Sequence, residues 1–175
     1  FLPLFFDLGL GEGFINGNKI DNFLTKLLDN IEFSEAKIPF HVIATNIKTG
    51  QPAIFSSGKL VPAVRSSISI PIIFKPYKYQ DKLLIDGGLS DPVPVDILKK
   101  NGADVVIAVN LYHKNEFKQD KFNMQKIALN SVKVALHNLA SVSVQHADYT
   151  LNPDTSEFLR EIKMKDYFKP ENVEK

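Results

Sequence analysis

Residues 83–95, which read LLIDGGLSDPVPV, constrain the fold of this chain more than any other segment. The apolar beginning, bounded by glycine and proline, predicts a buried strand at residues 83–85. Asp86 follows where that strand ends, which is where α/β sheets place functional side chains. Gly87 and Gly88 carry no side chain, so a neighbouring backbone or a reacting group can come close to the carboxylate.

Apolar periodicity and the positions of glycine and proline predict alternating helices and strands along the chain. We expect helices at residues 19–30 (with Asn18 as the N-cap), 60–67, 94–100 and 125–144, and strands at residues 40–46, 51–55, 105–109 and 149–151. Residues 105–109 are apolar throughout, which is typical of a strand buried on both faces of a parallel sheet. The alternation indicates an α/β fold.

Composition fits one globular domain of 175 residues with 44% hydrophobic residues. A net charge of +1, with Arg65 and Arg160 as the only arginines, gives no indication of a nucleic-acid partner. The absence of cysteine excludes disulfides and fits a cytoplasmic location, although a targeting signal upstream of Phe1 would not be visible. No apolar stretch in the sequence approaches the roughly 18 residues of a membrane span.

The acidic residues and histidines predict no metal site. Aspartates recur at every fifth position, namely Asp81, Asp86, Asp91 and Asp96, but they lack the glycine and glutamate of an EF-hand loop. The histidines, His41, His113, His137 and His146, lack the spacing of a zinc site, and we interpret them as structural or solvent-facing.

The order of short motifs across residues 38–109 closely resembles the second half of the patatin-like phospholipase family, especially its bacterial members. The motifs are IPFHVIATN, a Thr-Gly turn, IFSSG, AVRSSISIP, the Asp-Gly-Gly segment and NGADVVIAV. The likeness covers residues 10–111. It implies a lipid acyl hydrolase (phospholipase or esterase) with a three-layer α/β/α domain, a mainly parallel or mixed sheet, a Ser-Asp dyad and no cofactor. By this resemblance Asp86 is the general base, and Asp86, Gly87 and Gly88 form the family's Asp-Gly-Gly/Ala motif.

The family's nucleophile motif, Gly-x-Ser-x-Gly, is absent from these 175 residues. The nearest match, at residues 88–92, has Pro92 in place of the last glycine, and the glycine-rich run at residues 9–14 ends in Phe14. We therefore expect residues 1–175 to be the C-terminal part of one domain, with the serine and the oxyanion loop upstream. The missing N-terminal half is then the expected partner of this chain.

Asp86 also has a simpler interpretation, as a turn aspartate whose side chain accepts bonds from nearby N–H groups. The flanking motifs favour the catalytic interpretation. A serine hydroxyl is a poor nucleophile until a base within hydrogen-bond reach takes its proton. Burial at a strand end would raise the pKa of Asp86 and make its carboxylate a better base.

Arg65 and Ser67 match an Arg-Ala-Ser motif of the family, from which Ser66 departs. Arg65 would steady a phosphate or the loop beside Asp86; alternatively it is a helix arginine that pairs with a carboxylate or a carbonyl. Ile72 replaces the glycine that usually follows the family's Ile-Pro pair, which calls the local turn geometry into question.

Two expectations concern apolar surface. The cluster in residues 1–8 is interpreted as core against the missing half, or as a contact with a membrane surface or an acyl chain. Removal of that half is expected to expose part of Val42, Ile43, Ala44, Leu84, Ile85, Val106, Ile107 and Val109, and to promote self-association. The alternative to a lipid hydrolase is a non-catalytic binding or scaffolding domain of the same fold.

Overall fold

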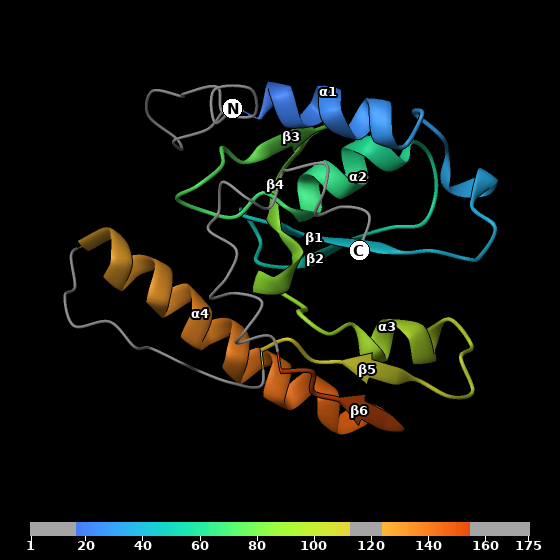
Figure 1. Ribbon diagram of the computed structural model, residues 1–175, viewed down its shortest axis with the longest axis vertical. Helices are drawn as coiled ribbons and strands as arrows, with labels where there is room; N and C mark the ends of the chain where they lie inside the picture. Colours follow the sequence, from blue (N-terminus) through green and yellow to red (C-terminus); the bar gives the residue numbers. More distant parts are fainter. Residues whose placement is uncertain (1–16, 113–123, 155–175) are drawn as a thin grey trace.

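The computed structural model describes residues 17–112 and 124–154. Its larger sheet has four antiparallel strands in the order β2-β1-β4-β3: β1 (Val42–Asn46), β2 (Pro52–Phe55), β3 (Tyr77–Tyr79) and β4 (Lys82–Asp86). Helix α2 (Leu60–Ser67) packs on β1 and β4, and α1 (Asn18–Leu27) packs on α2, so both helices lie on one side of this sheet (Figure 1).

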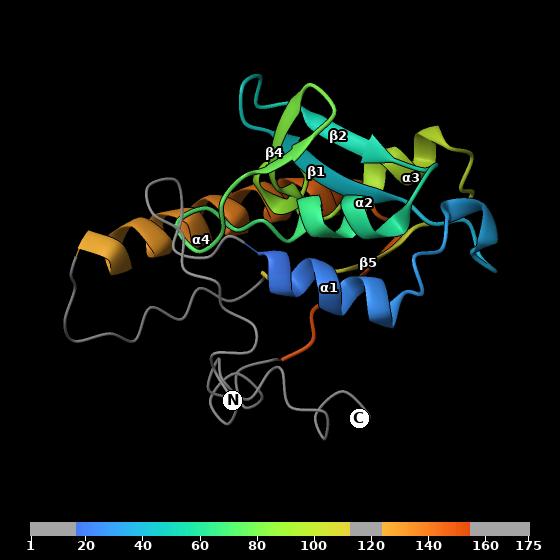
Figure 2. The same ribbon diagram turned by 90° about the horizontal axis from the view of Figure 1, so that it is seen from above.

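The chain then passes through a short 3-10 helix, η3 (Gly87–Leu89), into a second part of the fold. This part holds α3 (Val95–Lys100), β5 (Ile107–Val109), the long α4 (Met124–Ser143) and β6 (Tyr149–Leu151), with β5 and β6 paired in parallel. Figure 1 shows α4 below the larger sheet and α1 at the opposite end, and Figure 2 shows α2 and α1 on the same side of β1. Two further 3-10 turns are η2 (Phe33–Glu35) and η4 (Val144–His146). The fold is α/β, with sheets of mixed orientation.

Most predicted elements are present within one or two residues of their expected ends, and α2 has the predicted limits. Strand β3 was not predicted, because its sequence, Tyr-Lys-Tyr, is short and lies between turns. The prediction that Asn18 caps α1 is wrong: Gly17, with a φ of 92°, is the N-cap and Asn18 is the first helical residue. The helix also ends at Leu27 rather than at residue 30, since Asp29 and Asn30 have left-handed backbones.

The expectation about exposed strands is wrong for six residues and confirmed for two. Val42, Ile43, Ala44, Leu84, Ile85 and Val106 are buried. Four of them, Val42, Ala44, Leu84 and Val106, belong to small packed clusters, for example Ala44 with Ala53 and Leu84. Ile107 and Val109, however, are 59% and 54% exposed, so β5 is not buried on both faces as its sequence predicts.

Helix α4 also differs from expectation. Residues 126–146 are long and apolar enough to cross a membrane by length and composition, and little of this segment is buried. Core helices of soluble proteins can have the same length and apolar composition, so these two properties alone assign no membrane span.

We expect the 175-residue chain to self-associate through the apolar face of β5 and β6. Ile107, Val109 and Leu151 are all more than half exposed on these two strands, and apolar surface left in water forgoes roughly 2.5 kcal/mol per 100 Å². The double substitution Ile107→Lys, Val109→Lys should reduce the associated fraction in sedimentation or light scattering. Ile38→Lys, at an exposed residue outside the sheets, is the control. A wild-type chain that stays monomeric at tens of micromolar would contradict this expectation.

Candidate functional site

Asp86 is the last residue of β4 and the N-cap of η3. One carboxylate oxygen, Oδ1, accepts a 2.8 Å hydrogen bond from the Gly88 backbone N–H. The Asp86 backbone N–H donates to the Ser69 carbonyl at 3.0 Å. The carboxylate is thus held on a short turn at the junction between the two parts of the fold, at the strand end where the sequence predicts it.

Gly87 and Gly88 allow two close approaches that a side chain would block. A Cβ on Gly87 would lie 2.0 Å from the Ile43 carbonyl oxygen of β1, so the backbones touch there. A Cβ on Gly88 would lie 2.9 Å from Leu136 Cδ2 of α4 and 3.0 Å from Asp86 Oδ1. The structure thus shows a close backbone approach at Gly87 and a close side-chain approach at Gly88. The approach of a reacting group to the carboxylate stays a prediction.

A buried threonine fixes the turn from the β1 side. The Thr45 hydroxyl lies 2.7 Å from the Asp86 carbonyl, to which it donates, and 2.8 Å from Ser90 Oγ. The Ser90 backbone N–H in turn donates to the Gly87 carbonyl. Sequence reasoning gave Thr45 and Ser90 no role in fixing the turn, because their contact joins residues 45 positions apart.

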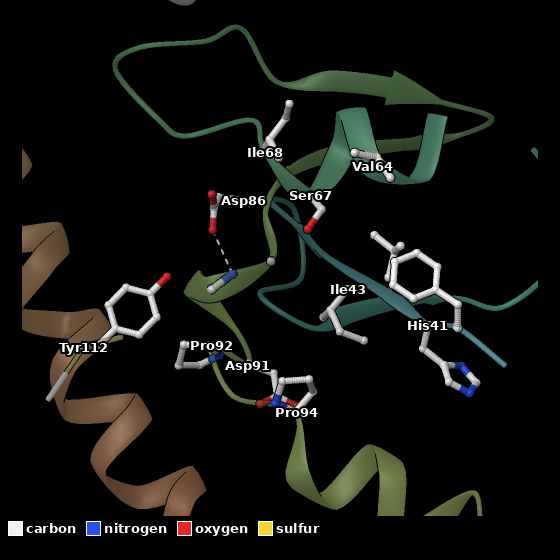
Figure 3. A pocket seen from close by; sticks show the side chains of 14 residues that line it. His41, Ile43, Val64, Ser67, Ile68, Asp86, Asp91, Pro92, Pro94 and Tyr112 are labelled. Atoms are coloured by element: carbon white, nitrogen blue, oxygen red, sulfur yellow. Dashed lines mark hydrogen bonds between the residues drawn. The ribbon is translucent and has the colours of Figure 1, made fainter. Parts of the chain in front are cut away.

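A hollow of about 410 Å³ opens beside Asp86. Apolar residues from β1 and α2 form much of its wall, and Ser67, Asp91 and Tyr112 line it with Asp86. Figure 3 shows the Ser67 hydroxyl and the Tyr112 hydroxyl pointing into this space from opposite sides. The structure therefore brings Asp86, Gly87, Gly88 and Ser67 together around one cavity.

Burial raises the pKa of the Asp86 carboxyl above its ordinary value of 3.8, and the Gly88 N–H bond opposes this rise in part. Burial, followed by the charge of Asp96, likewise raises the pKa of Asp91. The pKa of Tyr112 is raised first by burial and then by the nearby charge of Asp86. A carboxylate with a raised pKa is a stronger base than one in water, which suits a proton acceptor.

Arg65 is not among the residues that line this hollow. Its side chain is 1% exposed, and its Nε lies 3.0 Å from Asp21 Oδ1 of α1. Its Nη1 donates to Ser69 Oγ at 2.7 Å, and its guanidinium lies over the rings of Phe74 and Tyr77. The interpretation as a helix arginine paired with a carboxylate is therefore the one the structure supports. Arg65 reaches Asp86 only indirectly, through Ser69.

Two of the described histidines make side-chain contacts that fit a structural role. His137 of α4 bonds to the Tyr112 carbonyl, and His146 bonds to Asp96 at 2.8 Å. His41 lies just before β1 and lines the hollow. His113 and residues 1–16, with the apolar cluster and the glycine-rich run, lie outside the described residues. Within the described ranges no group of three or more His, Cys, Asp or Glu side chains could hold a metal ion.

Comparison with known proteins identifies the family of this chain. Residues 2–99 match the patatin-like phospholipase family, and this match covers more than half of the chain. The chain belongs to this family. The resemblance seen in the sequence is thereby confirmed, and the match ends within α3, before β5, α4 and β6.

Individual relatives share only part of their length with this chain. It is 32% identical over 99 residues to an uncharacterized NTE family protein of Mycobacterium bovis, and it is 30% identical over 98 residues to lysophospholipase nte1 of Aspergillus fumigatus. The alignments cover 57% and 56% of this chain, but only 28% and 6% of those relatives. A putative patatin-like phospholipase domain-containing protein of Caenorhabditis elegans is 32% identical over 104 residues, which is 57% of this chain and 9% of that protein.

Proposed function

We propose that this chain supplies the general base of a serine lipid acyl hydrolase that acts on lysophospholipids or related acyl esters. The observation that carries the proposal is Asp86: a carboxylate fixed at a strand end, with a pKa raised by burial, facing a hollow. Membership of the patatin-like phospholipase family and the similarity to a fungal lysophospholipase support this substrate class.

In this proposal the nucleophile is a serine upstream of the chain, since Gly-x-Ser-x-Gly is absent from its sequence. Asp86 accepts the serine proton as the hydroxyl attacks the acyl carbonyl, and then returns it to the leaving alcohol. A water molecule attacks the acyl-enzyme by the same route, and the fatty acid leaves. The missing N-terminal half is also the proposed cover for the apolar face of β5 and β6. We propose a cytoplasmic protein that works at a lipid surface.

The test compares the full-length protein with the isolated 175-residue chain. We expect the full-length protein to release fatty acid from a palmitoyl lysophosphatidylcholine and to be labelled by a fluorophosphonate probe. The isolated chain should do neither, because it has a base but no activated serine. Specific labelling of the isolated chain would overturn the assignment of the nucleophile. A folded full-length protein that releases no fatty acid would favour a non-catalytic binding domain.

A further inference from the structure

A second hollow, also of about 410 Å³, lies on the other side of Asp86, between α4 and the segment at residues 70–73. We call it the α4 groove. Its walls are mainly apolar: Ile70, Pro71 and Ile73 come from the loop, and Leu129, Val132 and Leu136 come from α4. Asp86 and Tyr112 line both this groove and the hollow described above. The two spaces therefore meet at the proposed general base.

The apolar wall comes close to the carboxylate of Asp86. Leu136 Cδ2 and Asp86 Oδ1 lie within about the same distance, 2.9 and 3.0 Å, of the position that a Cβ on Gly88 would occupy. The residues of α4 that line the groove run from Lys126 to Leu136. At 1.5 Å per helical residue this wall is about 15 Å long. A linear hydrocarbon chain with its first carbon at Asp86 fits such a shape.

The groove also carries positive charge on one wall. Lys126 and Lys133 line it from α4, and Lys133 is exposed. Lysine stems cover apolar surface while their ammonium groups stay in water. The lysine stems therefore add apolar surface to the α4 wall of the groove.

Helix α4 lies beyond residue 99, where the family match ends. One wall of the α4 groove is therefore not part of the sequence that the chain shares with its family. Pockets of about 300–1,000 Å³ with apolar walls and a few polar groups are typical of ligand sites.

We propose that the α4 groove binds the acyl chain of the substrate, with the ester carbonyl at Asp86, and selects single-chain lipids with a medium-length or longer tail. The position of the ester in this inference rests on the proposed function. The binding of the tail in the α4 groove does not depend on it.

The test uses the full-length protein and a dansyl-labelled medium-chain fatty acid, whose fluorescence reports binding. Leu136→Trp should fill the groove and weaken binding about tenfold or more, the effect of overpacking a tight site. Leu139→Trp is the matched control, since Leu139 lies three residues further along α4, is 38% exposed and does not line the groove. Its affinity should stay at the wild-type value. Absence of binding, or equal affinities in the two variants, would overturn the proposal.

A second readout separates this inference from the proposed function. In the hydrolysis assay, Leu136→Trp should lower the ratio of the rate on a palmitoyl ester to the rate on a butyryl ester, whereas Leu139→Trp should leave the ratio unchanged. If the wild-type protein hydrolyses neither ester, the proposed function fails. The fatty-acid binding assay then still decides whether the α4 groove binds an acyl chain. An unchanged ratio in Leu136→Trp would show that the groove does not hold the acyl chain.

Discussion

Asp86→Asn in the full-length protein is expected to reduce turnover of acyl esters by about 10²- to 10⁴-fold, the usual contribution of a general acid–base group. Asparagine has nearly the same volume, and its Oδ1 still accepts the Gly88 N–H bond, but it cannot take up the serine proton. The loss should therefore appear mainly in kcat, measured by fatty-acid release, with little change in the affinity for the lipid.

Asp91→Asn provides the matched control. Asp91 lines the same hollow, and burial raises its pKa as well, yet no step is assigned to it. Its substitution should change turnover only slightly. Equal losses in the two variants, or wild-type turnover in Asp86→Asn, would show that Asp86 is not the base.

Asp86→Asn should leave the fold intact and make the protein more stable at neutral pH. Because the pKa of Asp86 is raised in the folded chain, its proton is held more tightly there than in the unfolded chain. The resulting stability is present below the unfolded value of 3.8 and is lost as the pH rises through the folded pKa. At pH 7, where the unfolded chain has lost this proton, Asp86 therefore contributes less to stability than it does at low pH. Thermal unfolding should show a higher midpoint for Asp86→Asn at pH 7, and the difference should shrink as the pH falls towards 3.8.

Local patterns predicted the elements and the position of Asp86 because both depend on short segments. The apolar run before the glycine pair places the carboxylate at a strand end, and the periodicity of residues 60–67 sets both ends of α2. Strand β3 pairs with the adjacent β4 in a hairpin, but its three residues are too few to give a sequence pattern. The left-handed cap at Gly17 depends instead on a contact with a distant residue. A Cβ on Gly17 would lie 1.8 Å from Arg65 Nη2, so the start of α1 is set by a side chain 48 positions away.

Within the site, too, local sequence patterns do not reveal residues that approach Asp86 only in the folded chain. Ser67 and the glycine pair were found from their motifs, whereas Thr45, Ser69 and Tyr112 reach Asp86 only through tertiary contacts. The doubt about Ile72 did have a structural basis. Its φ of 74° lies in the left-handed region that favours glycine, so the turn keeps a conformation suited to glycine with an isoleucine in its place.

Asp21→Ala is expected to produce a large loss of stability, although the substituted residue lies outside the hollow. It removes the carboxylate that lies 3.0 Å from Arg65 Nε and leaves the guanidinium buried. Breaking a buried ion pair from one side typically costs 3–5 kcal/mol. We expect a loss of about 3 kcal/mol, at the lower end of that range, because water already reaches the Asp21 side chain, which is 34% exposed.

Arg65→Met should cost less than Asp21→Ala, although it removes the larger group. The methionine fills part of the space between Phe74 and Tyr77, and the carboxylate that remains is accessible to water. This order is opposite to the order expected if the size of the deleted side chain decided the loss. The free energies of unfolding are compared from urea denaturation curves, provided that the slopes agree between variants.

Lys99→Ala is the control for this series, since it breaks an exposed pair in which the Lys99 and Asp148 side chains are 41% and 38% exposed. Exposed pairs of this kind contribute little to stability, because water and salt screen the two charges. The loss of the Asp21–Arg65 pair should also loosen the turn that carries Asp86. Arg65 bonds to Ser69, and the Ser69 carbonyl accepts the Asp86 N–H bond. Asp21→Ala should therefore increase hydrogen exchange at the Asp86 amide more than Lys99→Ala does. If Asp21→Ala and Lys99→Ala cost the same, the buried pair does not stabilise the turn that carries Asp86.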